Sequence, residues 1–276
     1  MNKNILVLYH ANCLDGFGAA YAAWRKFKDE AEYIPCQYGD EPPDCSGKQV
    51  YILDFSFPRE TLIEMNAQAN FLLVLDHHKT AKSDLEGLPF AVFDMEKSGC
   101  ILAWEHFHPA PDSAPEMLNL IQDRDLWKFE YPETKDFCAG LWVKDRDFEE
   151  WYYCNYDEIT AIGKVLNCQF QKEVENLAKR AHTISVVDRE TGQKRFGLAV
   201  NAPAKYSSEL GNVLANSSGV CGITYAYDGS KQEWQYSARS IDSGVDVSAI
   251  AKDYGGGGHR NAAGFSSNEL LFLQPL

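Results

Sequence analysis

Short apolar runs alternate with amphipathic segments along the first half of this chain, and this alternation restricts the fold more than any other feature. The runs 4–10, 49–56 and 70–78 have the length and composition of buried strands. Segments 17–29 and 98–107 carry apolar residues at helical spacing, and a further helix begins near Pro58. This order of elements predicts an α/β fold in which helices flank a mostly parallel sheet.

The second half of the chain has a different pattern of apolar residues. A long helical pattern covers 159–182, and beyond it short runs with strand-like alternation at 194–203, 219–228 and 234–241 are mixed with two helical segments. We therefore predict a catalytic domain over 1–184, including a connector helix at about 158–184. A smaller α/β domain would follow over 185–276. A helix over 113–127 is expected to break at Asp123.

Composition limits the classes of partner. The net charge of −14 argues against a passive basic surface for long nucleic acid, which needs local positive charge. The eight cysteines include no CxxC pair, so neither a zinc knuckle nor a disulfide scaffold is indicated. The apolar run near Met1 is too short for a signal sequence or a membrane span. We expect a cytoplasmic protein that binds no membrane, and we leave a homodimer open.

Polar residues that bind metals in many proteins follow several predicted strands and one predicted helix. They are His10, Asp15, Asp54, Asp76, His77, His78 and Asp123. Residues that follow parallel strands converge at one edge of the sheet. A single Asp in such a place is usually a helix cap or a turn former, but the whole set would repel or stay unsatisfied without a cation.

A two-metal centre is the chemical use that this set favours. Mixed oxygen and nitrogen ligands suit manganese, iron or zinc. Two such ions can activate a water and stabilise the charge that builds on a phosphoryl group. We predict that Asp54, on a central strand, bridges the two ions and that Asp76 orients an imidazole.

Several motifs resemble those of one enzyme family. "HANCLDG", "LDFS", "LDHHKT" and "IQDRDLW" resemble, in order, the four motifs of the DHH-family phosphoesterases, which include RecJ-like exonucleases, nano-RNases and cyclic-dinucleotide phosphodiesterases. "GGGGHRNAAGF", preceded by "SARS", resembles the DHH-associated substrate-binding domain. The resemblance covers nearly the whole chain.

The resemblance implies roles for individual residues. His10 and Asp54 match the ligands of a first manganese ion, and the second ion would be held by Asp15, Asp54, His77 and Asp123. Asp125 is the alternative to Asp123. His78 matches the position that faces the substrate phosphate, so the expected catalytic residues are His78, Asp76 and His259.

One position departs from the family pattern. The first motif usually has two acids after its histidine, whereas this chain has only Asp15, with Cys13 near the place of the other. A thiolate ligand would favour zinc or iron over manganese. Cys13 is either such a ligand or a small buried residue that leaves water to complete the site.

The glycine-rich end predicts an anion clamp. The backbone N–H groups of Gly256, Gly257 and Gly258 can approach an anion closely. Arg239 would grip a terminal phosphate, His259 would donate near the scissile group, and Arg260 would add positive charge.

These features together predict a metal-dependent phosphodiesterase that hydrolyses short oligoribonucleotides or linear dinucleotides in an interdomain cleft. One alternative is a phosphatase or phosphodiesterase for a small nucleotide, such as a 3′,5′-bisphosphate or a cyclic nucleotide. Another is a nucleotide-binding sensor that does not hydrolyse its ligand. Among the aromatic residues, we expect Trp127 to be the one that stacks on a base.

Overall fold

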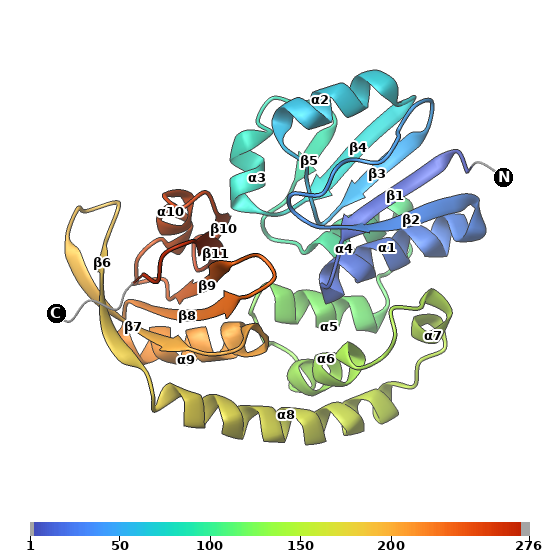
Figure 1. The fold of residues 1–276 in the computed structure, drawn as a ribbon. Helices are drawn as coiled ribbons and strands as arrows, with labels where there is room; N and C mark the ends of the chain where they lie inside the picture. The colour runs from blue at the N-terminus through green and yellow to red at the C-terminus, as the bar shows by residue number, and fades with distance from the viewer. Residues whose placement is uncertain (1–2, 272–276) are drawn as a thin grey trace. The chain divides into compact units, whose positions relative to one another are not determined.

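The computed structural model describes residues 3–271. Its internal contacts divide the chain into two units, Met1–Asn167 and Cys168–Leu276. The division falls within the long helix α8 (Tyr156–Ala178), which Figure 1 shows in yellow-green. The domain limits 1–184 and 185–276 therefore stay a prediction from the sequence.

The first unit is built on a five-stranded sheet in which every pairing is parallel. The strand order is β2-β1-β3-β4-β5. The strands are β1 (Ile5–His10), β2 (Ala31–Cys36), β3 (Gln49–Leu53), β4 (Phe71–Asp76) and β5 (Ala91–Phe93). This sheet confirms the fold class that the alternation predicts.

Helices cover both faces of this sheet (Figure 1). One core packs Val7 and Leu53 against α1 (Leu14–Phe27), α4 (Gly99–Phe107), α5 (Glu116–Asp125), α6 (Thr134–Trp142) and α7 (Phe148–Tyr152). The other packs Leu8 and Ile52 against α2 (Arg59–Gln68) and against Leu85, which follows the short α3 (Lys79–Asp84). Because both faces are covered, the strands are apolar at consecutive positions.

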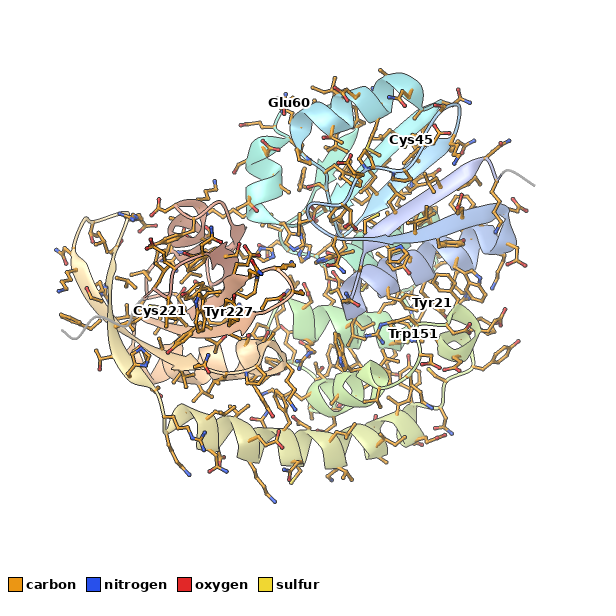
Figure 2. The ribbon with its side chains drawn as sticks, viewed as in Figure 1. Tyr21, Cys45, Glu60, Trp151, Cys221 and Tyr227 are labelled. Atoms are coloured by element: carbon orange, nitrogen blue, oxygen red, sulfur yellow. The ribbon has the colours of Figure 1, made fainter. Side chains whose placement is uncertain are left out.

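Aromatic side chains join α7 to α1. The Trp151 ring is 1% exposed and lies 4.7 Å from the Phe17 ring and 6.2 Å from the Tyr21 ring, centroid to centroid. Figure 2 labels Tyr21 and Trp151 in this part of the first unit. Aromatic pairs at such spacings contribute beyond their burial. Trp151 is therefore a core residue.

The second unit contains a six-stranded mixed sheet of order β10-β11-β9-β8-β7-β6. Only the β7–β8 pairing is parallel. The strands are β6 (His182–Val187), β7 (Lys194–Asn201), β8 (Cys221–Asp228), β9 (Glu233–Ser240), β10 (Gly257–His259) and β11 (Ala262–Ser267), and the helices are α9 (Ser207–Ser218) and α10 (Val247–Lys252). This sheet confirms a second, smaller α/β part.

Two predicted boundaries are wrong. Helix α5 continues through Asp125 instead of breaking at Asp123. Helix α8 ends at Ala178, and His182 begins strand β6. Four of the six residues of this strand are β-branched, which favours the extended backbone. None of the helices within residues 3–271 has both the length and the apolar character that crossing a membrane requires.

Candidate active site

The carboxyl ends of three neighbouring strands bring the predicted ligands together. His10 is the last residue of β1, Asp54 follows β3, and Asp76 is the last residue of β4, with His77 next in the chain. Strand β3 lies between β1 and β4, so Asp54 is central. Asp54, Asp76 and His77 are each at most 2% exposed.

The two carboxylate oxygens of Asp54 face different imidazoles. Its Oδ2 lies 3.5 Å from His10 Nδ1, and its Oδ1 lies 3.1 Å from His77 Nε2. Asp54 holds a left-handed backbone with φ of 56°, a region that Asp and Asn tolerate better than other side chains. Strain of this kind is typical of functional sites.

His77 is also close to two further acids. Its Nε2 lies 3.6 Å from Asp15 Oδ2 and 3.5 Å from Asp125 Oδ2. Asp15 is held in place by α4, because its two oxygens accept the backbone N–H groups of Gly99 at 2.6 Å and Cys100 at 2.9 Å. A carboxylate at a helix N-terminus is favoured by the helix dipole.

Gly99 allows this close approach. A Cβ atom at residue 99 would lie 2.4 Å from the Cβ of Asp54, which no real contact permits. No local sequence pattern points to Gly99, because Asp15 and Asp54 are far from it in the chain. Gly99 is thus a structural requirement of the site.

The Asp76 carboxylate lies beside the His78 imidazole. Its Oδ1 accepts the backbone N–H of His77 at 2.7 Å and lies 2.7 Å from His78 Nδ1. This contact fixes the orientation of the His78 imidazole.

Burial and mutual repulsion set the proton affinities here. Burial raises the pKa of Asp15 to about 8, and the charges of Asp54 and Asp125 add to the effect. Burial would lower the pKa of His77, but its hydrogen bond to Asp54 and the neighbouring carboxylates raise it to about 10. Burial would also raise the pKa of Asp54, yet the imidazoles of His10 and His77 hold it below its usual value. The clustered acids therefore favour a positive charge beside them, whether a proton or a metal ion.

In the first unit, two groups of side chains have the composition and spacing of metal sites. The potential ligand atoms within each group lie within 4.8 Å of one another. The groups are His10, Asp54 and His78, and Asp15, His77 and Asp125.

The residues present fit divalent metal ions. Within residues 3–271, two buried polar atoms of this region, His10 Nδ1 and Asp76 Oδ2, have no hydrogen-bond partner. Buried polar atoms are normally satisfied, and an imidazole nitrogen and a carboxylate oxygen are donor atoms that a divalent cation or a water would satisfy. Nitrogen and oxygen donors together suit manganese, iron or zinc.

The fourth motif, "IQDRDLW", contains two acids, Asp123 and Asp125, and they lie in different surroundings. The Asp123 carboxylate accepts the backbone N–H of Glu130 at 2.8 Å and the hydroxyl of Thr134 at 2.5 Å, so it holds the loop after α5. Asp125, the alternative, lies beside His77. Of the two acids, Asp125 is the one that contacts another expected ligand, so we use it in place of Asp123 in the proposal below. Thr134 is eleven residues from Asp123, so no local pattern could reveal their bond.

In the second unit, Arg239 lies on β9. Its guanidinium donates to the hydroxyls of Ser208 at 2.9 Å and Ser237 at 3.0 Å, which hold it in one orientation. Arg260 has different partners from Arg239. Its guanidinium donates to the backbone oxygen of Gly244 at 3.2 Å and to the side chain of Asn261 at 2.9 Å. Arg260 therefore ties neighbouring loops together.

The glycine run has structural uses. The N–H of Gly256 donates to Ala251 O at 2.9 Å and so closes the end of α10. Gly258 has φ of 138°, and a Cβ there would lie 2.4 Å from Ala262 O. Gly257, Gly258 and His259 form strand β10, which pairs with β11. The predicted anion clamp thus coincides with a tight strand pairing.

Comparisons with known proteins agree with this architecture. Residues 192–274 match the family model described as the DHHA1 domain. The uncharacterized protein R106 of Acanthamoeba polyphaga mimivirus is 34% identical, covering 98% of this chain and 69% of its own length. Oligoribonuclease NrnB of Bacillus subtilis is 25% identical, covering 96% of this chain and 73% of its own. The chain belongs to the DHH family of phosphoesterases.

Solved structures of DHH-family proteins share the fold. The pGpG-specific phosphodiesterase PggH of Vibrio cholerae superposes with a TM-score of 0.53 at 14% identity, covering 96% of this chain and 93% of PggH. RecJ of Thermus thermophilus, in complex with Mn²⁺, has a TM-score of 0.50 at 14% identity, covering 97% of this chain and 50% of RecJ. The family resemblance drawn from the motifs is confirmed.

Cys13 is the position at which this DHH-family chain departs from the motif. Within residues 3–271, neither of the two ligand groups in the first unit includes its thiol. Burial raises the pKa of Cys13 well above its usual value, and the charges of Asp54, Asp125 and Asp15 add to this. Cys13 is half-buried, and its two expected roles, a thiolate ligand or a small residue that leaves water to complete the site, both stay predictions.

Proposed function

We propose that this DHH-family protein is a metal-dependent phosphodiesterase that hydrolyses short oligoribonucleotides or linear dinucleotides. The observation that carries the proposal is the Asp54 carboxylate, whose oxygens face His10 and His77 separately. A carboxylate shared between two groups of ligands is the arrangement that a two-metal phosphoesterase centre needs.

Different residues of the chain would bind the metal ions and the substrate phosphate. His10 and Asp54 would hold one ion, and Asp15, Asp54, His77 and Asp125 the other, with manganese as our first choice. Bound divalent ions would activate a water and neutralise charge on the phosphoryl group. His78, whose Nδ1 is taken by Asp76, would present Nε2 to the substrate phosphate.

Three observations support a short substrate. The relative from Bacillus subtilis is named an oligoribonuclease. The net charge of −14 disfavours binding along a long polyanion. Arg239, held by Ser208 and Ser237, has the fixed orientation that suits bidentate binding of a terminal phosphate.

The test measures product formation. Metal-stripped protein is incubated with a 5′-phosphorylated diribonucleotide, with and without Mn²⁺, and products are separated by chromatography. We expect mononucleotide only when metal is present. Asp54→Asn, which suits the left-handed backbone, should abolish it, whereas Asp94→Asn, a change on the surface, should not.

Other outcomes would separate the alternatives. Intact diribonucleotide in every sample would contradict the proposal. Recovery of that intact ligand bound to the protein would instead favour the nucleotide-binding sensor. Metal-dependent release of phosphate from a 3′,5′-bisphosphate, without cleavage of the diribonucleotide, would favour the small-nucleotide phosphatase.

A further inference from the structure

An exposed tyrosine lies against the imidazoles of the site. The Tyr38 ring centroid is 5.7 Å from that of His10 and 6.5 Å from that of His78. Yet Tyr38 is 59% exposed, which is unusual for a large side chain that contacts two buried or half-buried residues. We propose that Tyr38 is a stacking platform for the nucleobase next to the scissile phosphate.

The backbone around Tyr38 holds the ring in place. Residues Gln37 to Asp40 form a tight turn, in which the N–H of Asp40 donates to Gln37 O at 3.1 Å. The Asp40 carboxylate closes the turn by accepting the N–H of Gln37 at 2.7 Å. Gly39 follows with φ of 96°, the conformation that the third position of a type II turn demands. Tyr38 therefore occupies the second position of a well-defined turn.

The buried ring of Phe55 packs against Tyr38. Phe55, which is 1% exposed, lies 5.0 Å from Tyr38 at an interplanar angle of 49°. The contacts of Tyr38 with His10 and His78 are edge-to-face, at 68° and 86°. None of these three contacts is a parallel stack that would cover a face of the tyrosine ring. Because 59% of Tyr38 is exposed, part of its ring surface is open to a ligand.

The position of Tyr38 beside His78 indicates which kind of ligand group its ring would contact. His78 is the residue that we assign to the substrate phosphate, and a nucleobase lies one sugar away from its phosphate. Every base has a flat π face, so stacking on an aromatic side chain tolerates any sequence. This inference rests on the proposed nucleotide substrate and adds the residue that would recognise its base.

Trp127, the aromatic residue favoured from sequence, is placed differently. Its ring packs edge-to-face on Phe129 at 4.9 Å. Within residues 3–271 it has no ring contact with His10 or His78, whereas Tyr38 contacts both. Tyr38 is therefore the better candidate for stacking in the first unit.

Binding measurements test the platform without requiring turnover. The Mn²⁺-loaded full chain is titrated calorimetrically with AMP and with ribose 5-phosphate, which differ only in the base. We expect Tyr38→Ala to weaken AMP binding roughly 5- to 100-fold and to leave ribose 5-phosphate binding unchanged. Tyr38→Phe should keep the preference for AMP, and Tyr38→Leu, which retains an apolar contact with Phe55, should lose it.

Three results would overturn the inference. They are equal affinity of the wild type for both ligands, equal weakening of both ligands in Tyr38→Ala, and no weakening in that variant. A parallel Mn²⁺ titration should show unchanged metal affinity in Tyr38→Ala. Cleavage of the diribonucleotide is scored separately, so base-selective binding without cleavage would reject the proposed function and keep the platform.

Discussion

Buried Asp76 and half-buried His78 form a pair in which the carboxylate Oδ1 lies 2.7 Å from the imidazole Nδ1. Burial would lower the pKa of His78, but the Asp76 charge raises it to about 9. The pair keeps Nε2 oriented and favours the protonated ring. A donor of this kind suits a phosphate ligand better than a metal ion.

Replacing Asp76 by Asn should disturb this pair while preserving side-chain size. We expect a loss of activity of roughly 10- to 100-fold, the usual cost of removing a partner that orients a catalytic imidazole. The alkaline limb of the pH–rate profile should also move to lower pH, because the neutral amide no longer stabilises imidazolium. Kinetics across pH would check this, and an unchanged profile would show that Asp76 has no such role.

Asp123 and Asp125 provide a matched pair of variants. Asp125→Asn should weaken Mn²⁺ binding at least about tenfold, since loss of an outer partner alone costs that much. Asp123→Asn should keep metal affinity and lower the free energy of unfolding by about 1–3 kcal/mol, because the donors of Glu130 and Thr134 lose their charged acceptor. Calorimetric metal titration and urea denaturation would measure both. The reverse pattern would restore Asp123 as the ligand.

The stability of the metal-free protein should fall as pH rises from about 6.5 to 9. The folded-state pKa is about 8 for Asp15 and about 10 for His77, both raised above the usual values. Between about pH 6.5 and 8 both groups bind more protons in the folded state than in the unfolded state, and above pH 8 His77 continues to do so. Each group costs up to about 1.4 kcal/mol per pH unit where it acts. Asp54, whose pKa is lowered, adds no slope there because its contribution is lost only in acid.

Metal should reverse that pH dependence, since a divalent cation compensates the same carboxylates that protons neutralise. Thermal denaturation at pH 6.5 and 9, with and without Mg²⁺, would show a larger metal-induced stabilisation at the higher pH. Asp15→Asn should flatten the slope of the metal-free protein. A metal-free protein that becomes more stable with rising pH in this window would refute the expectation.

Gly99→Ala tests whether the close approach of residue 99 to Asp54 is required. The added methyl would meet the Asp54 side chain, so we expect a loss of about 1–3 kcal/mol in unfolding free energy together with weaker metal binding. Gly229→Ala is the control, because nothing lies within 4 Å of its added Cβ. Equal effects of the two changes would mean that contact with Asp54 is unimportant.

Much of the fold was predictable because its signals are local. Continuous apolar runs indicated strands covered on both faces, and the polar residues after β1, β3 and β4 indicated where the site lies. Helix ends were less predictable. A break of α5 at Asp123 is expected from the sequence, but the helix continues to Asp125. The two acids face different partners, Asp123 the loop after α5 and Asp125 the His77 ring.

The sequence alone determined the alternation of strands and helices, the family and the set of acids and histidines that gather at the strand ends, since each depends on short spacing or residue type. The tertiary structure decided which acid reaches His77, what Gly99 permits and where Tyr38 lies. These depend on contacts between residues far apart in the chain, such as Gly99 with Asp15 and Thr134 with Asp123. A buried carboxylate goes to whichever donors the packed chain places beside it, and no local pattern records that choice.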